Sequence, residues 1–305
     1  MKKIHNAKST QGISLRTKGE MSFMAFLLLP LMLLLIFEYY PILMGVFASF
    51  FSVNIVDLPG KFVGFANYAR VFHDKEFYMT VYQTIKHYVY ELGMAFWPPI
   101  LCALLVNEVR GKVGKAFFRT IYYLPAVAPS VAMLVFWKFF WNPDYGLANQ
   151  IISVFGLEKR LWLNEENLVY FCMHFQGLVL VGGMNMLIYL AAMQDIPNEQ
   201  YEAALIDGAG FWKRFRYITF PGIKGVVGSL FLLSVVGAFN RMEDVLVLTG
   251  GGPYGKTQTV LSHAYEIACE GVDYAYAITV STVLFMLVLV IGLVVNKLKT
   301  IGKEE

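Results

Sequence analysis

One run of residues matches, letter for letter, a pattern that binds phosphate groups. Gly250 is followed after four residues by Gly255-Lys256-Thr257, which satisfies the phosphate-loop pattern GxxxxGK[ST]. That chemistry requires a strand before the loop and a helix after it, so that backbone N–H groups surround the phosphate. Here the preceding segment is long and apolar, and Pro253 removes one N–H donor. We therefore expect a glycine-rich turn and no nucleotide site.

Polar side chains within apolar segments form a second candidate site. Such groups are costly in lipid, so each is a functional candidate by default. Amide and acid side chains can hydrogen-bond the hydroxyl groups of a polar ligand. Two alternatives stay open: hydrogen bonds between helices, and an ion pair of Arg241 with Glu243 or Asp244 that shapes the outer gate. The candidates for a substrate pathway are Gln176, Asn185, Ser234, Asn240, Arg241 and Glu243.

Cysteine and charge patterns exclude other kinds of site. Cys102, Cys172 and Cys269 lie far apart and form no CxxC pair, so the sequence predicts neither a disulfide framework nor a metal site. The net charge of +3 is too small to suggest nucleic acid as a partner. We expect no metal and no nucleic acid to bind this chain.

The composition indicates which elements must position these residues. The 305 residues are 57% hydrophobic and 15% charged, with a mean hydropathy of +0.54, whereas soluble domains carry about 25% charged residues. Six apolar runs are near or above the about 20 residues with which a helix crosses a bilayer. The sequence therefore predicts an all-α, polytopic membrane protein with a six-helix transmembrane domain over 23–296. The predicted spans are 23–50, 82–106, 120–141, 168–193, 223–248 and 273–296.

The distribution of lysine and arginine predicts the orientation of these spans. Sixteen of the 25 basic residues lie in segments on the N-terminal side of the membrane, and six lie in the loops opposite. Cytoplasmic segments carry the excess of Lys and Arg. We therefore expect a multi-pass protein embedded in membrane lipid, with cytoplasmic tails over 1–22 and 297–305. The first span is expected to be retained because no small-residue cleavage site follows it.

The largest cytoplasmic loop, 194–222, has the pattern of helix, turn and helix. Asp195 is the predicted N-cap of the first helix, and Pro197 suits its first turn. Gly208 is expected to end that helix, because glycine takes the left-handed conformation at little cost. Pro221 is expected to begin the fifth span. The local features alone fit equally a helix that transmits force and one that only caps the bundle.

This loop also contains a spaced set of residues: Glu202-Ala203-Ala204, Gly208 after three further residues, Ile218 after nine more, and Phe220-Pro221 after one more. The set resembles the EAA loop of binding-protein-dependent ABC importer permeases. That pattern usually has leucine before the proline, and Phe220 is a mild departure. The resemblance implies a type I importer permease-like bundle. It also implies that an ATPase is contacted by Glu202, Ala203, Ala204, Asp207, Gly208, Ile218 and Pro221.

Three other segments narrow the resemblance to the carbohydrate branch of that family. Residues 62–68, 142–146 and 248–253 are similar to outer-side segments of the larger subunit of maltose-type importers. The resemblance implies a bacterial, non-catalytic subunit that imports a sugar or oligosaccharide. Its implied partners are a second related permease, two ATPase subunits that bind ATP and magnesium, and an extracytoplasmic solute-binding protein. The permease chain itself is expected to bind no cofactor.

Other functions stay open on the sequence alone. An ion-coupled secondary transporter would use intramembrane acids such as Glu38 and Glu91 as proton or sodium sites, although no second copy of the interrupted-span pattern occurs in the sequence. A membrane scaffold would have no pathway. An importer of a solute like glycerol phosphate has only Arg241 in its favour.

Overall fold

The computed structural model describes residues 26–53, 60–109, 111–180 and 182–301, and about three-quarters of them are helical. The prediction of an all-α protein is confirmed. The predicted tail over 1–22 and residues 302–305 of the other tail lie outside the described residues. The elements are η1 (Leu35–Tyr39), α2 (Tyr40–Ala48), α3 (Ala66–His73), α4 (Lys75–Glu91), η2 (Leu92–Phe96), α5 (Pro98–Glu108), α6 (Lys112–Val127), α7 (Ser130–Phe140), α8 (Leu147–Val154), α9 (Val169–Leu180), α10 (Gly183–Gln194), α11 (Asn198–Ile206), α12 (Phe211–Arg214), η3 (Phe215–Thr219), α13 (Phe220–Phe239), α14 (Glu243–Leu248), α15 (Val260–Cys269) and α16 (Tyr274–Ile301).

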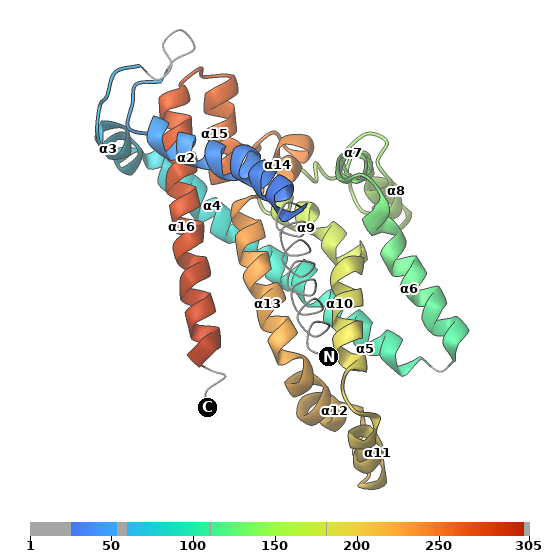
Figure 1. Ribbon diagram of the computed structural model, residues 1–305. Coiled ribbons are helices and arrows are strands. Elements are labelled where there is room, and N and C mark those ends of the chain that lie inside the picture. Colours follow the sequence, from blue (N-terminus) through green and yellow to red (C-terminus); the bar gives the residue numbers. More distant parts are fainter. Residues whose placement is uncertain (1–25, 54–59, 110, 181, 302–305) are drawn as a thin grey trace, which may run out of the picture.

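The long helices lie side by side, with α11 and α12 at the lower end of the molecule and α3, α8 and α15 at the upper end (Figure 1). Four helices are long and apolar enough to cross a membrane, and two bent pairs, α6 with α7 and α9 with α10, can each count as one more span. The described residues thus contain four to six spans, and six requires that each bent pair crosses once. The four helices are Phe26–Ala48, Lys75–Glu108, Phe211–Phe239 and Tyr274–Val294.

Three predicted spans differ from the structure, and one of them, 168–193, is bent by 45° between α9 and α10. The segment 120–141 is not one straight helix, since α6 and α7 meet at 93°. Pro125 lies inside α6 and Pro129 is the N-cap of α7, and proline in a helix removes a backbone hydrogen bond and clashes with the preceding turn. The segment 223–248 is also divided, because α13 ends at Phe239 and α14 begins anew at Glu243.

The other prolines do not break their helices. Each of the three π-helical segments directly precedes a proline in the first turn of the next α-helix, at Pro41, Pro98 and Pro221. A proline lacks the N–H group of the regular ladder, and a wider π turn accommodates both the missing bond and the ring. The prediction that Pro221 begins a separate span is therefore wrong, because Pro221 lies within the continuous helix Phe211–Phe239.

Close packing at glycine positions brings the helices of the core together. A Cβ atom at Gly183 would lie 2.1 Å from the carbonyl oxygen of Tyr122, which shows that α10 touches the backbone of α6. Gly177 similarly approaches Ala95, where a Cβ would lie 2.5 Å from the alanine methyl group. Small residues permit such contacts between membrane helices. Helix α10 thus lies among α5, α6 and α13, in one of three clusters of buried apolar side chains.

Gly183→Ala is expected to destabilise the protein by about 1–3 kcal/mol, because the added methyl group must push α6 away from α10. The measurement is thermal denaturation of the purified protein. Gly225→Ala is the matched control, since among the described residues no atom beyond the helix's own nearby backbone lies within 4 Å of a Cβ at that position, and alanine favours the helix by about 1 kcal/mol. Equal melting temperatures for the two variants would contradict the close contact.

Candidate functional site

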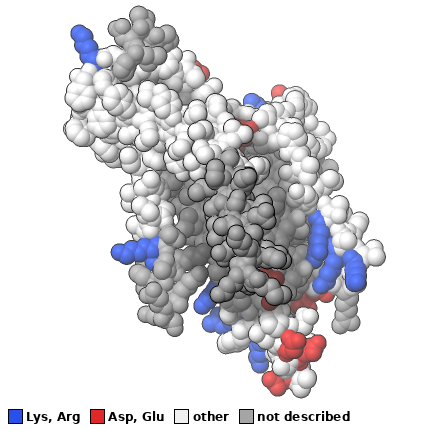
Figure 2. All heavy atoms as spheres, viewed as in Figure 1, with Lys and Arg blue, Asp and Glu red and all other residues white. Residues whose placement is uncertain are grey.

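The predicted coupling loop forms a projecting hairpin of helices. Helix α11 lies at the lower tip of the molecule and α12 turns back toward the bundle (Figure 1). The acidic side chains of this tip gather over α11 in Figure 2, whereas basic side chains lie over α6. Of the predicted coupling residues, Ala204 and Ile218 are half-buried. The others, Glu202, Ala203, Asp207, Gly208 and Pro221, are exposed.

A glycine closes the tip of this hairpin. Gly208 has φ +72°, a left-handed conformation that is strained for any other L-residue. It follows α11 directly, and the N–H group of Ala209 then donates to the carbonyl of Ala204 at 2.8 Å. No atom lies within 4 Å of a Cβ built at Gly208. The requirement for glycine within this chain is therefore conformational, as predicted, and the surface around it is open to a partner.

The base of the hairpin is tied to the bundle by polar contacts. The hydroxyl groups of Tyr201 and Thr219 are 2.9 Å apart, and Arg214 forms an ion pair with Glu108 of α5 at 3.5 Å. The predicted N-cap was wrong: α11 starts after Pro197, whereas Asp195 ends α10. The proline fixes its own φ angle and so starts the helix without a side-chain cap. These contacts join α11 to η3 and α12 to α5.

The tip also exposes apolar side chains beside its acids. Ile206 is 87% exposed and Leu205 is 56% exposed. Exposed large apolar groups on a projecting element commonly mark a protein contact. The combination of carboxylates, a bare glycine turn and apolar side chains therefore fits docking of a protein partner.

Four of the six predicted pathway residues line one cavity of about 490 Å³: Gln176, Asn240, Arg241 and Glu243. This cavity lies where α6, α7, α9 and the end of α13 meet. The other two do not line it. Ser234 lies 3.4 Å from the hydroxyl group of Tyr88, and Asn185 is half-buried on α10. The structure thus assembles part of the predicted set into one polar cavity.

Arg241 is the charged centre of this region. Its guanidinium group pairs with Asp244, the i, i+3 partner considered from the sequence, and with Glu91 of α4 at 2.6 Å. All three side chains are less than one-fifth exposed. The alternative partner Glu243 instead accepts a hydrogen bond from Ser130 at 3.0 Å. The role of Glu91 could not be found from the sequence, because it lies 150 residues before Arg241.

The glycine-rich outer loop is fixed against two helices by imidazole rings. His87 of α4 lies 2.9 Å from the carbonyl oxygen of Thr257 and 3.0 Å from the ring of His174. The phosphate-loop pattern in this loop does not form a phosphate site. A helix rather than a strand precedes it, the Thr257 hydroxyl group donates to the carbonyl of Gly252, and Lys256 pairs with Glu166. The sequence gave no sign of the contact between His87 and His174.

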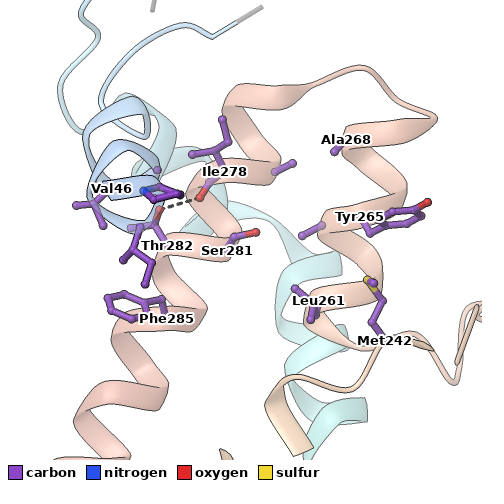
Figure 3. A pocket seen from close by; sticks show the side chains of 14 residues that line it. Val46, Met242, Leu261, Tyr265, Ala268, Ile278, Ser281, Thr282 and Phe285 are labelled. Carbon is purple, nitrogen blue, oxygen red and sulfur yellow. Dashed lines mark hydrogen bonds between the residues drawn. The ribbon is translucent and has the colours of Figure 1, made fainter. Parts of the chain in front are cut away.

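A separate apolar groove of about 430 Å³ lies between α2, α15 and α16. Figure 3 shows Leu261 and Tyr265 on one side, facing Ile278, Ser281 and Phe285 on the other. Its lining lacks charged side chains and amide groups among the described residues. This groove is therefore unsuited to hold a sugar.

The sequence of the chain matches a known protein family. The family described as "binding-protein-dependent transport system inner membrane component" matches residues 99–301, and the matched region includes both the hairpin and the polar cavity. The chain belongs to this family. It is therefore a transport subunit in a membrane and not an enzyme.

Individual relatives cover nearly the whole permease. A trehalose/maltose transport system permease protein of Thermococcus litoralis is 32% identical and covers 86% of this chain and 88% of its own length. A sn-glycerol-3-phosphate transport system permease protein of Escherichia coli is 32% identical and covers 87% of this chain and 89% of its own length. A crystal structure of a bacterial ABC transporter that imports alginate matches with a TM-score of 0.82 at 25% identity, over 94% of this chain and 98% of that one. A second crystal structure shows a bacterial alginate transporter in complex with a periplasmic protein that holds an alginate pentasaccharide. It matches with a TM-score of 0.80 at 25% identity, over 92% of this chain and 94% of that one.

Arg241→Met is expected to destabilise the permease by about 3 kcal/mol, because it leaves two partly buried carboxylates facing each other without a cation. A triple variant that also carries Glu91→Gln and Asp244→Asn removes all three charges and should recover most of the loss. Thermal denaturation of the purified variants measures both effects. A triple variant no more stable than Arg241→Met would contradict the charge pairing.

Proposed function

We propose that the permease forms half of the import pathway for a carbohydrate and is driven by a separate cytosolic ATPase through the hairpin at 194–222. The observation that carries this proposal is the form of the hairpin, an exposed acidic helix closed by Gly208 at φ +72° and continued into a span. A second, related permease would supply the other half of the pathway. Two ATPase subunits would bind ATP and magnesium below, with both tails of this chain on their side of the bacterial cytoplasmic membrane.

The continuous helix Phe211–Phe239 is the proposed link between ATPase and pathway. The helix begins within the hairpin. It stops at Phe239, next to Asn240 and Arg241, which line the polar cavity. Because Phe211–Phe239 is one continuous helix, a push at its hairpin end would move its far end as well. Glu202, Ala203, Ala204, Asp207, Gly208, Ile218 and Pro221 are the proposed contacts with the ATPase.

A sugar or oligosaccharide is the proposed substrate class. The similar proteins above include a permease for trehalose and maltose and transporters of the acidic polysaccharide alginate, and amide and hydroxyl groups in the cavity can hydrogen-bond sugar hydroxyls. The alternative substrate, a glycerol phosphate, is supported by one relative. However, Arg241 already faces two carboxylates, so its charge is balanced before any anion enters. Because Glu91 is paired with Arg241, it is not available as a free proton or sodium site.

Uptake by proteoliposomes that contain the complete complex and its solute-binding protein tests this proposal. Glu202→Lys and Gly208→Leu are each expected to lower ATP-driven sugar uptake by at least about tenfold, because one reverses a contact charge and the other strains the turn. Lys297→Glu, a charge reversal near the end of α16, should leave uptake unchanged. Asn240→Ala should raise the KM for sugar instead, as expected of a pathway residue.

Full uptake by both hairpin variants would contradict the coupling role. Uptake driven by an ion gradient without ATPase subunits would support a secondary transporter. Competition by glycerol phosphate, with none by sugars, would contradict the proposed substrate class and leave the coupling role intact.

A further inference from the structure

A second polar cavity lies at the end of the molecule opposite α11. It has a volume of about 390 Å³ and is bounded by the first turns of α4, the segment before α15, and α15 itself. Figure 1 places α15 at the upper end, away from the coupling hairpin. The polar residues of its lining are Glu76, Thr80, Gln83, Gln258, His263, Glu266 and Glu270, with Tyr254 at its edge.

The floor of this cavity carries unpaired polar atoms. Gln83 and His263 are each 4% exposed. The Oε1 atom of Gln83 and the Nε2 atom of His263 are buried, and neither has a hydrogen-bond partner among the described residues. A buried polar atom without a partner is destabilising, and native proteins retain few of them. Two such atoms in one cavity indicate a ligand that supplies the missing hydrogen bonds.

The rim of the cavity is acidic. Glu76, Glu266 and Glu270 are exposed around it, and none of the described lining residues is Lys or Arg. The nearby Arg70 is already paired with Asp273 at 2.5 Å. The ligand is therefore expected to carry a positive charge.

The positions of these acids suit an organic cation better than a metal ion. No three His, Cys, Asp or Glu side chains in the described parts of the chain converge closely enough to ligate a metal. An ammonium or guanidinium group instead carries several N–H donors that reach acceptors spread over a cavity. Three rim carboxylates and the Gln83 oxygen provide such a distribution.

We propose that this cavity binds a lysine or arginine side chain of the solute-binding protein, an inference that rests on the proposed function. Such a partner docks on the side of the membrane away from the ATPase, where this cavity opens. The lining residue Gln258 lies between Thr257, which is held by His87, and Thr259, whose hydroxyl group donates to the carbonyl of Arg241 at 2.5 Å. A docked cation would thus contact the loop that is fixed beside the polar cavity.

Binding of the solute-binding protein to the complete transporter in lipid nanodiscs tests the proposal. The double variant Glu266→Gln/Glu270→Gln is expected to raise the Kd by at least about tenfold and to weaken its dependence on salt. Glu158→Gln is the matched control, because Glu158 is exposed in the loop between α8 and α9 and does not line the cavity. Its Kd should equal that of the unchanged transporter.

Gln83→Met separates binding from folding. It keeps a similar volume and removes the unpaired oxygen, so a purely structural Gln83 would give an unchanged Kd and an equal or higher melting temperature. The proposal requires a raised Kd with the melting temperature retained.

Three outcomes would overturn the proposal. An unchanged Kd in the double variant, with normal uptake, would exclude the cavity and leave the proposed function standing. An equal loss of affinity for the solute-binding protein in Glu158→Gln would show a general effect of surface charge. Failure of the unchanged transporter to require a solute-binding protein for uptake would overturn the proposed function and this inference together.

Discussion

Arg241 lies just beyond the end of α13, and its contacts join three other helices to that point. Its side chain binds Glu91 of α4 and Asp244 of α14, while its carbonyl group accepts a hydrogen bond from Thr259 at the start of α15. A cation in a partly buried site must be balanced by such partners. The side chain and carbonyl group of this one residue therefore join α4, α13, α14 and α15, and Arg241 also lines the polar cavity.

The opposite end of the same helix begins at the coupling hairpin. The helix passes Pro221 without a break because a π-helical turn precedes the proline. In lipid, each backbone group that a proline leaves unpaired must be satisfied within the protein, so this turn allows a single rigid element to cross the membrane. The hairpin and the charge cluster are thus two ends of one helix. Under the proposed function, that arrangement would carry ATP-driven movement to the pathway.

Sequence patterns identified the elements better than they identified the contacts. Apolar length indicated where the long helices lie, although the predicted spans 120–141, 168–193 and 223–248 are each divided in the structure. The left-handed conformation of Gly208 followed from what a helix end requires. The effect of each proline could not be read from the sequence, since Pro125 and Pro129 accompany a 93° bend whereas Pro98 follows a π turn.

Contacts between segments that lie far apart in the chain could not be predicted from the sequence either. Gly225 has an open surface, whereas Gly183 touches a neighbouring backbone, because only the fold determines which helix faces meet. For the same reason Glu91 and His87 were not assigned their partners.

The most direct test of the account is the sidedness of two single cysteines in a cysteine-free background. Ile206 and Tyr254 are 87% and 88% exposed, at the coupling hairpin and the outer loop. A membrane-impermeant maleimide should label Tyr254→Cys only from the outside of sealed vesicles and Ile206→Cys only from the cytoplasmic side. Labelling of both cysteines from the same side would contradict the account.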